Sequence, residues 1–217
     1  QICKTQNYTI LSNIPERMSQ EQFDYIIVGT GIAGITLATH LHLTGKRLLI
    51  YTGTRDNVSS YVAAGLYNPI TGRKMVKTWM ADKLFNYLEP YYKRCEELSK
   101  ATFLHKKEIY RPFMNAEEQN EWMGKSADDA FEKYINQVQI KSTSRQVLDY
   151  NGGLSLNLSG YLDIPTYIES MTTFLSKHHM VIHDDFNHDS LITHEKHVLY
   201  DSFEAKKTIF CEGTVMK

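Results

Sequence analysis

Apolar and glycine-rich segments alternate near the start of the chain. The continuous apolar run Phe23–Val28 is rich in β-branched residues and predicts a buried parallel strand. Ile35–Leu43 has the length and composition of a helix packed on a sheet, with Gly45 as its expected C-terminal cap. Arg47–Tyr51 predicts a second strand. Strand, glycine turn, helix and strand close within about 30 residues, which is typical of a βαβ unit.

The next segment has mixed periodicity. Val58–Tyr67 is a short segment with many small residues and helical character. Asn68–Gly72 predicts a turn or loop. Helical spacing covers Trp79–Leu98, where Pro90 predicts a kink or break. We expect Trp79 to lie in the core at the start of this helix. Phe103–Phe113 mixes strand-forming residues with lysine and ends near Pro112.

Helix and strand signals continue through the second half. Asn115 predicts the N-cap of a helix that runs through Gly124, and Ala127–Val138 predicts another helix. Gln146–Leu162 predicts a hairpin whose turn is Asn151–Gly152.

The last quarter returns to a strand and helix pattern. Asp163 predicts the cap of a helix that begins with Ile-Pro and continues to about Lys177. Met180–His183 predicts a short strand, Leu191–Lys207 a β-meander, and Thr208–Cys211 a last buried strand.

Composition excludes several classes of function. The chain has 217 residues, of which 42% are hydrophobic and 23% charged, with a formal net charge of −1. These values are ordinary for a globular protein and give no broad basic face for nucleic acid. No apolar run approaches the roughly 20 residues that span a bilayer. Nothing in the sequence predicts an oligomeric state.

Cysteine and histidine usage gives no metal signal. The three cysteines are far apart and form no CxxC pair, which argues against a disulfide framework or zinc site and fits a reducing cytoplasm. Six of the nine histidines lie between positions 178 and 197, without metal-ligand spacing. We expect them on the surface or in loops.

Three glycines follow the first strand and open the first helix. Gly29 allows a tight turn, Gly31 lets a pyrophosphate approach the backbone, and Gly34 lets the helix pack closely on the strand. The N–H groups of the first helical turn, at Ile32 and Ala33, and the helix dipole favour phosphates. The context predicts dinucleotide binding; a nucleotide-free α/β fold is the alternative.

The acid that binds the ribose is missing from its usual place. It commonly ends the second strand, where this chain has Tyr51 and Thr52. Either Asp56 substitutes for it, or Thr52 forms a single hydrogen bond to the ribose.

Three further stretches resemble FAD-dependent oxidoreductases of the D-amino-acid oxidase and glycine oxidase superfamily, of the bacterial type. Ser59–Leu66 is similar to the family's small-residue helix against the flavin. Ser159–Pro165 is similar to the return from the substrate domain, and Thr208–Gly213 to the strand that re-enters the Rossmann sheet. The resemblance implies that Phe186 contacts the adenine of the cofactor. It implies further cofactor contacts from Ser60, Ala63, Ala64, Gly65, Leu66, Cys211 and Gly213.

The resemblance also implies a domain order. We expect an α/β fold: a Rossmann-type FAD-binding domain with an inserted α+β substrate or cap domain, incomplete at the C-terminus. The FAD-binding parts would be 21–78 and 161–217, and the inserted part 79–160. Residues 1–20 are expected to be a disordered or non-native tail, with Met18 as the natural start.

The activity implied by the resemblance is oxidation of a C–N bond in a small amine or amino acid, by hydride transfer to FAD. Arg73 is the candidate for contact with substrate or flavin. The chain ends earlier than the family does, so alone it is expected to bind FAD weakly or not at all and to lack turnover. An NAD-linked oxidoreductase and a non-catalytic dinucleotide-binding remnant are the alternatives.

Overall fold

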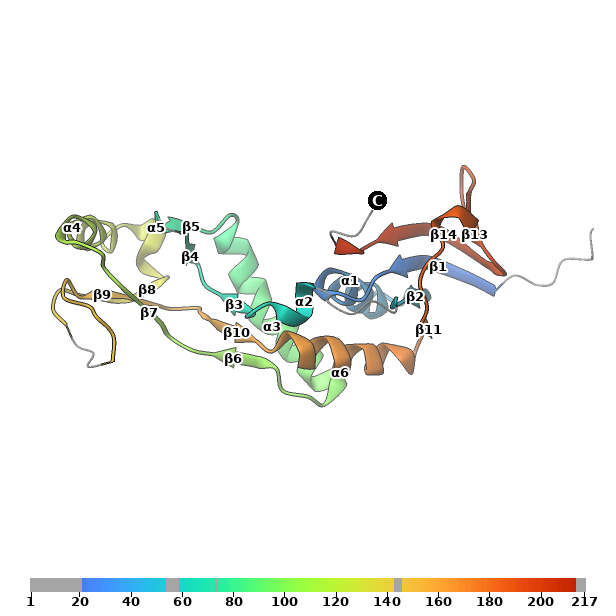
Figure 1. The fold of residues 1–217 in the computed structure, drawn as a ribbon, viewed down its shortest axis with the longest axis horizontal. Coiled ribbons are helices and arrows are strands. Elements are labelled where there is room, and N and C mark those ends of the chain that lie inside the picture. Colours follow the sequence, from blue (N-terminus) through green and yellow to red (C-terminus); the bar gives the residue numbers. More distant parts are fainter. Residues whose placement is uncertain (1–20, 54–58, 73, 143–145, 214–217) are drawn as a thin grey trace, which may run out of the picture.

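The computed structural model describes residues 21–53, 59–72, 74–142 and 146–213. The molecule is elongated, with a large sheet at one end and three small sheets toward the other (Figure 1). The N-terminal segment 1–20 and Asp56 lie outside the described residues.

The large sheet has six strands in the order β11-β2-β1-β14-β13-β12. The first four run parallel, and β13 and β12 continue antiparallel. In register, Tyr25 of the central strand lies between Leu48 and Lys207. The six strands are β1 Glu21–Val28, β2 Leu48–Tyr51, β11 Met180–Ile182, β12 Leu191–Thr193, β13 Val198–Tyr200 and β14 Phe203–Phe210.

Alternation along the central strands builds a core on each face of this sheet. Ile27 and Leu48 face a core that contains helices α1 (Ile32–Leu43), α3 (Ala81–Ser99) and α6 (Ile164–Ser176). The neighbouring strand residues Ile26, Val28, Leu49 and Tyr51 belong to the second core, with Phe186 and Tyr200. Burial on both faces explains why these strands are continuously apolar.

The rest of the chain forms a second lobe of small antiparallel sheets, ordered β3-β10-β6, β7-β9-β8 and β4-β5. Its core includes Met75, Trp122, Tyr134 and Leu154. The strands are β3 Leu66–Tyr67, β4 Ile70–Thr71, β5 Val76–Lys77, β6 Leu104–Lys106, β7 Ile109–Pro112, β8 Ile135–Gln139, β9 Gly153–Leu156 and β10 Gly160–Leu162. The helices outside the large core are α2 Ser59–Val62, α4 Ala116–Lys125, α5 Asp129–Glu132 and the 3-10 turn His188–Ser190.

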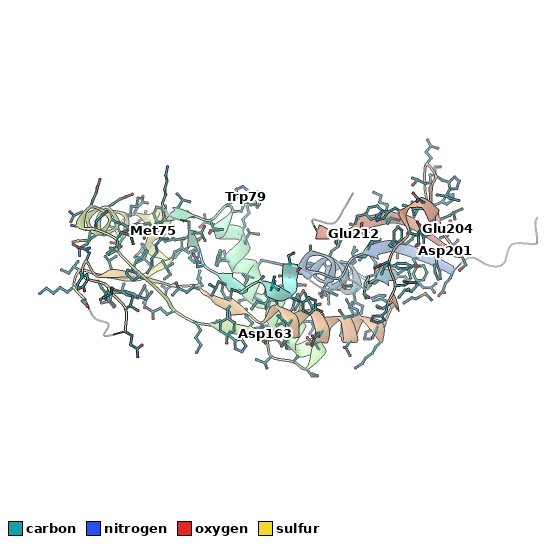
Figure 2. All side chains as sticks on the ribbon, in the orientation of Figure 1. Met75, Trp79, Asp163, Asp201, Glu204 and Glu212 are labelled. Carbon is teal, nitrogen blue, oxygen red and sulfur yellow. The ribbon has the colours of Figure 1, made fainter. Side chains whose placement is uncertain are left out.

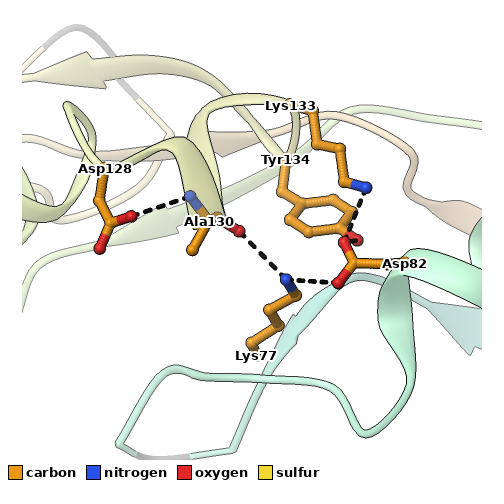
Figure 3. Close-up of polar contacts among 6 residues, drawn as sticks. All are labelled: Lys77, Asp82, Asp128, Ala130, Lys133 and Tyr134. Carbon is orange, nitrogen blue, oxygen red and sulfur yellow. Dashed lines mark hydrogen bonds and ion pairs between the residues drawn. The ribbon is translucent and has the colours of Figure 1, made fainter.

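A polar cluster joins the start of α3 to two other parts of this lobe (Figure 3). The Asp82 carboxylate accepts a hydrogen bond from Tyr134 and lies 2.7 Å from the ammonium groups of both Lys77 and Lys133. Lys77 also donates to the Ala130 carbonyl at 3.3 Å. These donors, Lys133 first, hold the pKa of Asp82 well below its usual range. The cluster therefore ties β5 and α3 to the segment that enters β8.

Local capping signals are confirmed. Asn115 accepts from the Glu118 N–H at 2.8 Å, and the Glu118 carboxylate accepts from the Met114 N–H at 2.7 Å. Asp163 accepts from the Thr166 N–H at 3.2 Å at the start of α6. The βαβ unit and the meander are also confirmed, although one strand, β14, replaces the two expected around Thr208.

Three expectations between positions 66 and 139 are wrong, because strand pairing, in two cases with strands far along the chain, decides the structure. Leu66–Tyr67 is strand, since it pairs with Gly160–Tyr161. Ile70–Thr71 is also strand and pairs with β5. The helix expected over 127–138 stops at Glu132, and β8 then pairs with β9.

Three further corrections concern 146–162, Trp79 and Pro90. The segment 146–162 forms no hairpin of its own, since β9 pairs with β7 and β8, and β10 pairs with β6 and β3. Trp79 is 78% exposed and not in the core (Figure 2). Its neighbour Met80 has a φ of 52°, so the chain turns sharply before α3 and leaves the indole outside. Helix α3 runs through Pro90 without a break.

Three histidines meet where α1 and α6 end. The His42 Nδ1 and His179 Nε2 atoms are 3.0 Å apart, and the His42 and His178 rings lie 5.0 Å apart. Burial, reinforced by the neighbouring imidazoles, lowers the pKa of His179 to about 4 and also lowers that of His42. Within the described ranges, no group of three or more His, Cys, Asp or Glu side chains is arranged to hold a metal ion. No helix among those residues is long and apolar enough to cross a bilayer.

This cluster predicts a loss of stability in acid. Because folding favours the neutral imidazoles, their contribution is present above the unfolded pKa of about 6.5 and is lost as the pH falls toward the folded pKa of His179. We expect His179→Asn to show a smaller fall in the urea midpoint between about pH 7 and about pH 5 than the unmodified chain. The exposed His194→Asn is the matched control and should keep the original slope. An unchanged slope in the His179 variant would contradict the assignment.

Candidate functional site

A groove of about 920 Å³ opens at the carboxyl ends of the parallel strands. It lies where the chain leaves β1, with β2 on one side of that strand and β14 on the other. This is the position at which open parallel sheets bind ligands. The walls come from the β1–α1 turn, the ends of β2 and β14, helices α2 and α6, and the segment after β11.

Close backbone packing shapes the floor of the groove. Gly29 has a φ of 99°, and a Cβ there would lie 2.5 Å from the Cys211 carbonyl oxygen. A Cβ on Gly34 would lie 1.9 Å from the Gly29 carbonyl oxygen. The Cys211 N–H donates to the Val28 carbonyl at 2.7 Å. These contacts hold the start of α1 against the ends of both β1 and β14.

The start of α1 faces the groove with backbone N–H groups. Gly31 is the N-cap, has extended backbone and provides no capping side chain, and the first turn carries no acidic residue. The Ile32 N–H donates to the Ser60 hydroxyl at 3.2 Å, so α2 supplies a polar partner there. The free N–H groups and the helix dipole make this end of α1 a favourable place for an anion.

The other end of the groove lies between β2 and the segment after β11. Thr52 places its hydroxyl 3.2 Å from the His183 Nδ1 atom. Phe186 is only 9% exposed and stacks on Tyr200, with ring centroids 4.0 Å apart. An apolar wall and a polar rim therefore stand side by side at this end.

Most of the residues singled out from sequence meet in this groove. Gly34 lies buried behind the floor, and Arg73 is outside the described residues. The stretch Ala63–Leu66 follows α2 without helical structure and does not line the groove; Gly65 instead accepts a 3.0 Å hydrogen bond from the Leu162 N–H. The predicted residues that do line the groove are Gly29, Gly31, Ile32, Ala33, Thr52, Ser60, Phe186, Cys211 and Gly213.

Sequence reasoning missed several lining side chains, because distant elements bring them in. Tyr61 of α2 faces the groove near Glu169 of α6, and burial together with that carboxylate raises the pKa of Tyr61. Asp185 follows β11 and was not singled out. The adjacent acids Asp184 and Asp185 directly after a short strand were the available signal.

Two ionisable groups, Cys211 and Glu212, follow β14 at the edge of the groove. The Glu212 carboxylate lies 3.1 Å from the His188 Nε2 atom, and its side chain is 15% exposed. Burial raises the pKa of the Cys211 thiol, which keeps it protonated at neutral pH.

A second cavity of about 410 Å³ lies between α3 and the small sheets. Its polar lining mixes both signs of charge, with Lys106, Lys133, Glu89 and Glu108 among the residues. Glu89 is paired with Lys93 and Lys106. With Lys107 the lining carries three lysines and two glutamates, a net charge of only +1, which gives little preference for an anionic ligand.

The fold resembles that of several solved oxidases and deaminases. No model of a known protein family matches the sequence. Glycine oxidase from Geobacillus kaustophilus superposes with a TM-score of 0.68 at 13% identity, covering 88% of this chain and 55% of that one. Iminodiacetate oxidase from a Chelativorans species gives 0.64 at 18% identity, covering 86% and 54%. L-amino acid deaminase from Proteus vulgaris gives 0.63 at 15% identity, covering 90% and 48%.

The chain therefore has the Rossmann-type α/β fold of these amino-acid oxidases and deaminases. It spans about half the length of the solved structures that it matches.

The glycine contacts predict a sharp difference between two similar substitutions. Gly34→Ala places a methyl group against the Gly29 carbonyl, and we expect the free energy of unfolding to fall by about 1–3 kcal/mol. Gly124→Ala, in exposed helix α4 with no atom within 4 Å of the new Cβ, should leave stability unchanged or raise it by up to about 1 kcal/mol. Urea denaturation measures both; equal effects would contradict the packing described for α1.

Proposed function

We propose that this chain carries the cofactor groove of an FAD-dependent oxidoreductase that oxidises a C–N bond in a small amine or amino acid. The observation that carries the proposal is the groove at the start of α1, on a fold shared with glycine oxidase, iminodiacetate oxidase and L-amino acid deaminase. The resemblance of the sequence to the glycine oxidase superfamily supports FAD as the cofactor.

The residues of the groove fit the ADP part of such a cofactor. The N–H groups at Gly31 and Ala33 would hold the pyrophosphate, with the Ser60 hydroxyl, which accepts from the Ile32 N–H, beside them. The apolar wall at Phe186 would take the adenine, and Thr52 would lie near the ribose. Gly29 and Gly34 leave no room for side chains between the strand and the helix, which keeps the groove floor at backbone level.

The flavin end of the site would lie beyond α2. Cys211 and Gly213, at the end of β14, would flank the cofactor there. We keep Ala63–Leu66 and Arg73 as candidate flavin or substrate contacts from the sequence resemblance. A bound flavin would supply a hydride acceptor for the carbon that bears the amine, and the protein would position the substrate and exclude water.

We also propose the domain division 21–78, 79–160 and 161–217, with the middle part as the substrate side. Helix α3 falls in this middle part, yet its Tyr91 and Cys95 pack in the core beside α1 and α6. Tyr91 donates or accepts a 2.9 Å hydrogen bond with Tyr167 of α6. The helix would therefore serve as the support on which the substrate side rests.

The proposal predicts a bound flavin that small amino acids reduce. The natural protein that contains this chain should release FAD on heat denaturation, and its flavin absorbance should bleach when glycine or another small amine is added without oxygen. Matched alcohols and sugars should leave the absorbance unchanged. Ser60→Ala should weaken FAD binding by about three- to tenfold, because the hydroxyl next to the start of α1 is lost.

Two results would overturn the proposal. One is a protein that holds no flavin and binds NADH instead, which favours an NAD-linked enzyme. The other is a bound flavin that no amine or amino acid reduces.

A further inference from the structure

The end of β2 continues beside the segment that follows β11. The Thr52 N–H donates to the Ile182 carbonyl at 3.0 Å, and the Gly53 N–H donates to the Asp184 carbonyl at 3.2 Å. The two segments therefore stay paired for two residues past Tyr51, where β2 ends. This places the residues after β11 directly at the position where a ribose-binding acid commonly ends the second strand.

Asp185 occupies that position. Its Oδ1 atom lies 3.4 Å from the point where a Cβ on Gly53 would be, and the side chain lines the groove. The Asp185 N–H donates to the Asp184 carboxylate at 2.8 Å, which holds the turn. A carboxylate thus stands over the end of β2, although it comes from a different strand.

The other polar groups nearby are less suited to this role. Three carboxylates line the groove among the described residues, at Glu169, Asp185 and Glu212. Glu169 belongs to α6 and Glu212 follows β14, so neither carboxylate comes from the segment that pairs with the end of β2. Thr52 offers a single hydroxyl, whereas a carboxylate offers two acceptor oxygens.

We infer that Asp185 replaces the missing acid of β2 and accepts hydrogen bonds from the ribose hydroxyls of an adenine nucleotide. The inference rests on the proposed function, because it requires a nucleotide in this groove. A carboxylate accepts two hydrogen bonds from adjacent hydroxyl groups and repels a phosphate on the 2′ oxygen. The groove therefore selects nucleotides with a free 2′-hydroxyl.

Binding of ADP tests the assignment without catalysis, because its adenosine and phosphates need only the described groove. In equilibrium dialysis the 217-residue chain should bind ADP about tenfold more tightly than 2′-deoxy-ADP or adenosine 2′,5′-bisphosphate. Asp185→Asn should weaken ADP binding to the level of 2′-deoxy-ADP, leave 2′-deoxy-ADP unchanged and improve binding of the 2′-phosphorylated nucleotide.

A control variant and a rescue variant complete the test. Asp201 precedes β14, whereas Glu212 follows it, so Asp201 lies away from the groove (Figure 2). Asp201→Asn removes the same charge as Asp185→Asn and should keep the preference for ADP over 2′-deoxy-ADP. Thr52→Asp in the Asp185→Asn background returns a carboxylate to the end of β2 and should restore the preference for ADP.

The outcomes separate this inference from the proposed function. Equal binding of ADP and 2′-deoxy-ADP by the unmodified chain would overturn the role of Asp185 and leave the cofactor groove intact. If the Asp185→Asn variant still binds ADP more tightly than 2′-deoxy-ADP, the role of Asp185 is likewise overturned. Failure of the natural protein and of this chain to bind either ADP or FAD would overturn both.

Discussion

The contact of three backbones at Gly29, Gly34 and Cys211 is the constraint on which the rest of the site depends. The helix and the two strands approach so closely that a Cβ at either glycine would overlap a carbonyl oxygen. Because of this approach, α1 begins directly over the carboxyl ends of β1 and β14. The N–H groups of its first turn, which lack partners within the helix, then face the groove and not the sheet.

The same geometry makes the two ends of the groove chemically different. At the helix end, N–H groups, the Ser60 hydroxyl and a partial positive charge favour an anion. At the β2 end, the ring of Phe186 and the carboxylate of Asp185 favour a flat apolar group with hydroxyls beside it. An adenine nucleotide has these groups in this order, which is why the proposals for phosphate, adenine and ribose agree.

Local backbone chemistry could be predicted from the sequence, and distant pairing could not. The glycine turn and the caps at Asn115 and Asp163 depend on residues within a few positions of one another, and each formed as expected. Leu66–Tyr67 is strand only because β10, nearly a hundred positions later, pairs with it. Asp185 was missed for the same reason, since its place over Gly53 depends on the pairing of β11 with β2.

The most direct test of the central claim is a backbone amide NMR titration of the chain with ADP. The account predicts that the resonances of Gly31, Ile32 and Ala33 shift most, together with Gly53 at the β2 end. Residues of the second cavity, such as Lys106 and Lys107, should not move. Shifts concentrated at that second cavity, with the start of α1 unchanged, would contradict the claim that the glycine turn forms the nucleotide site.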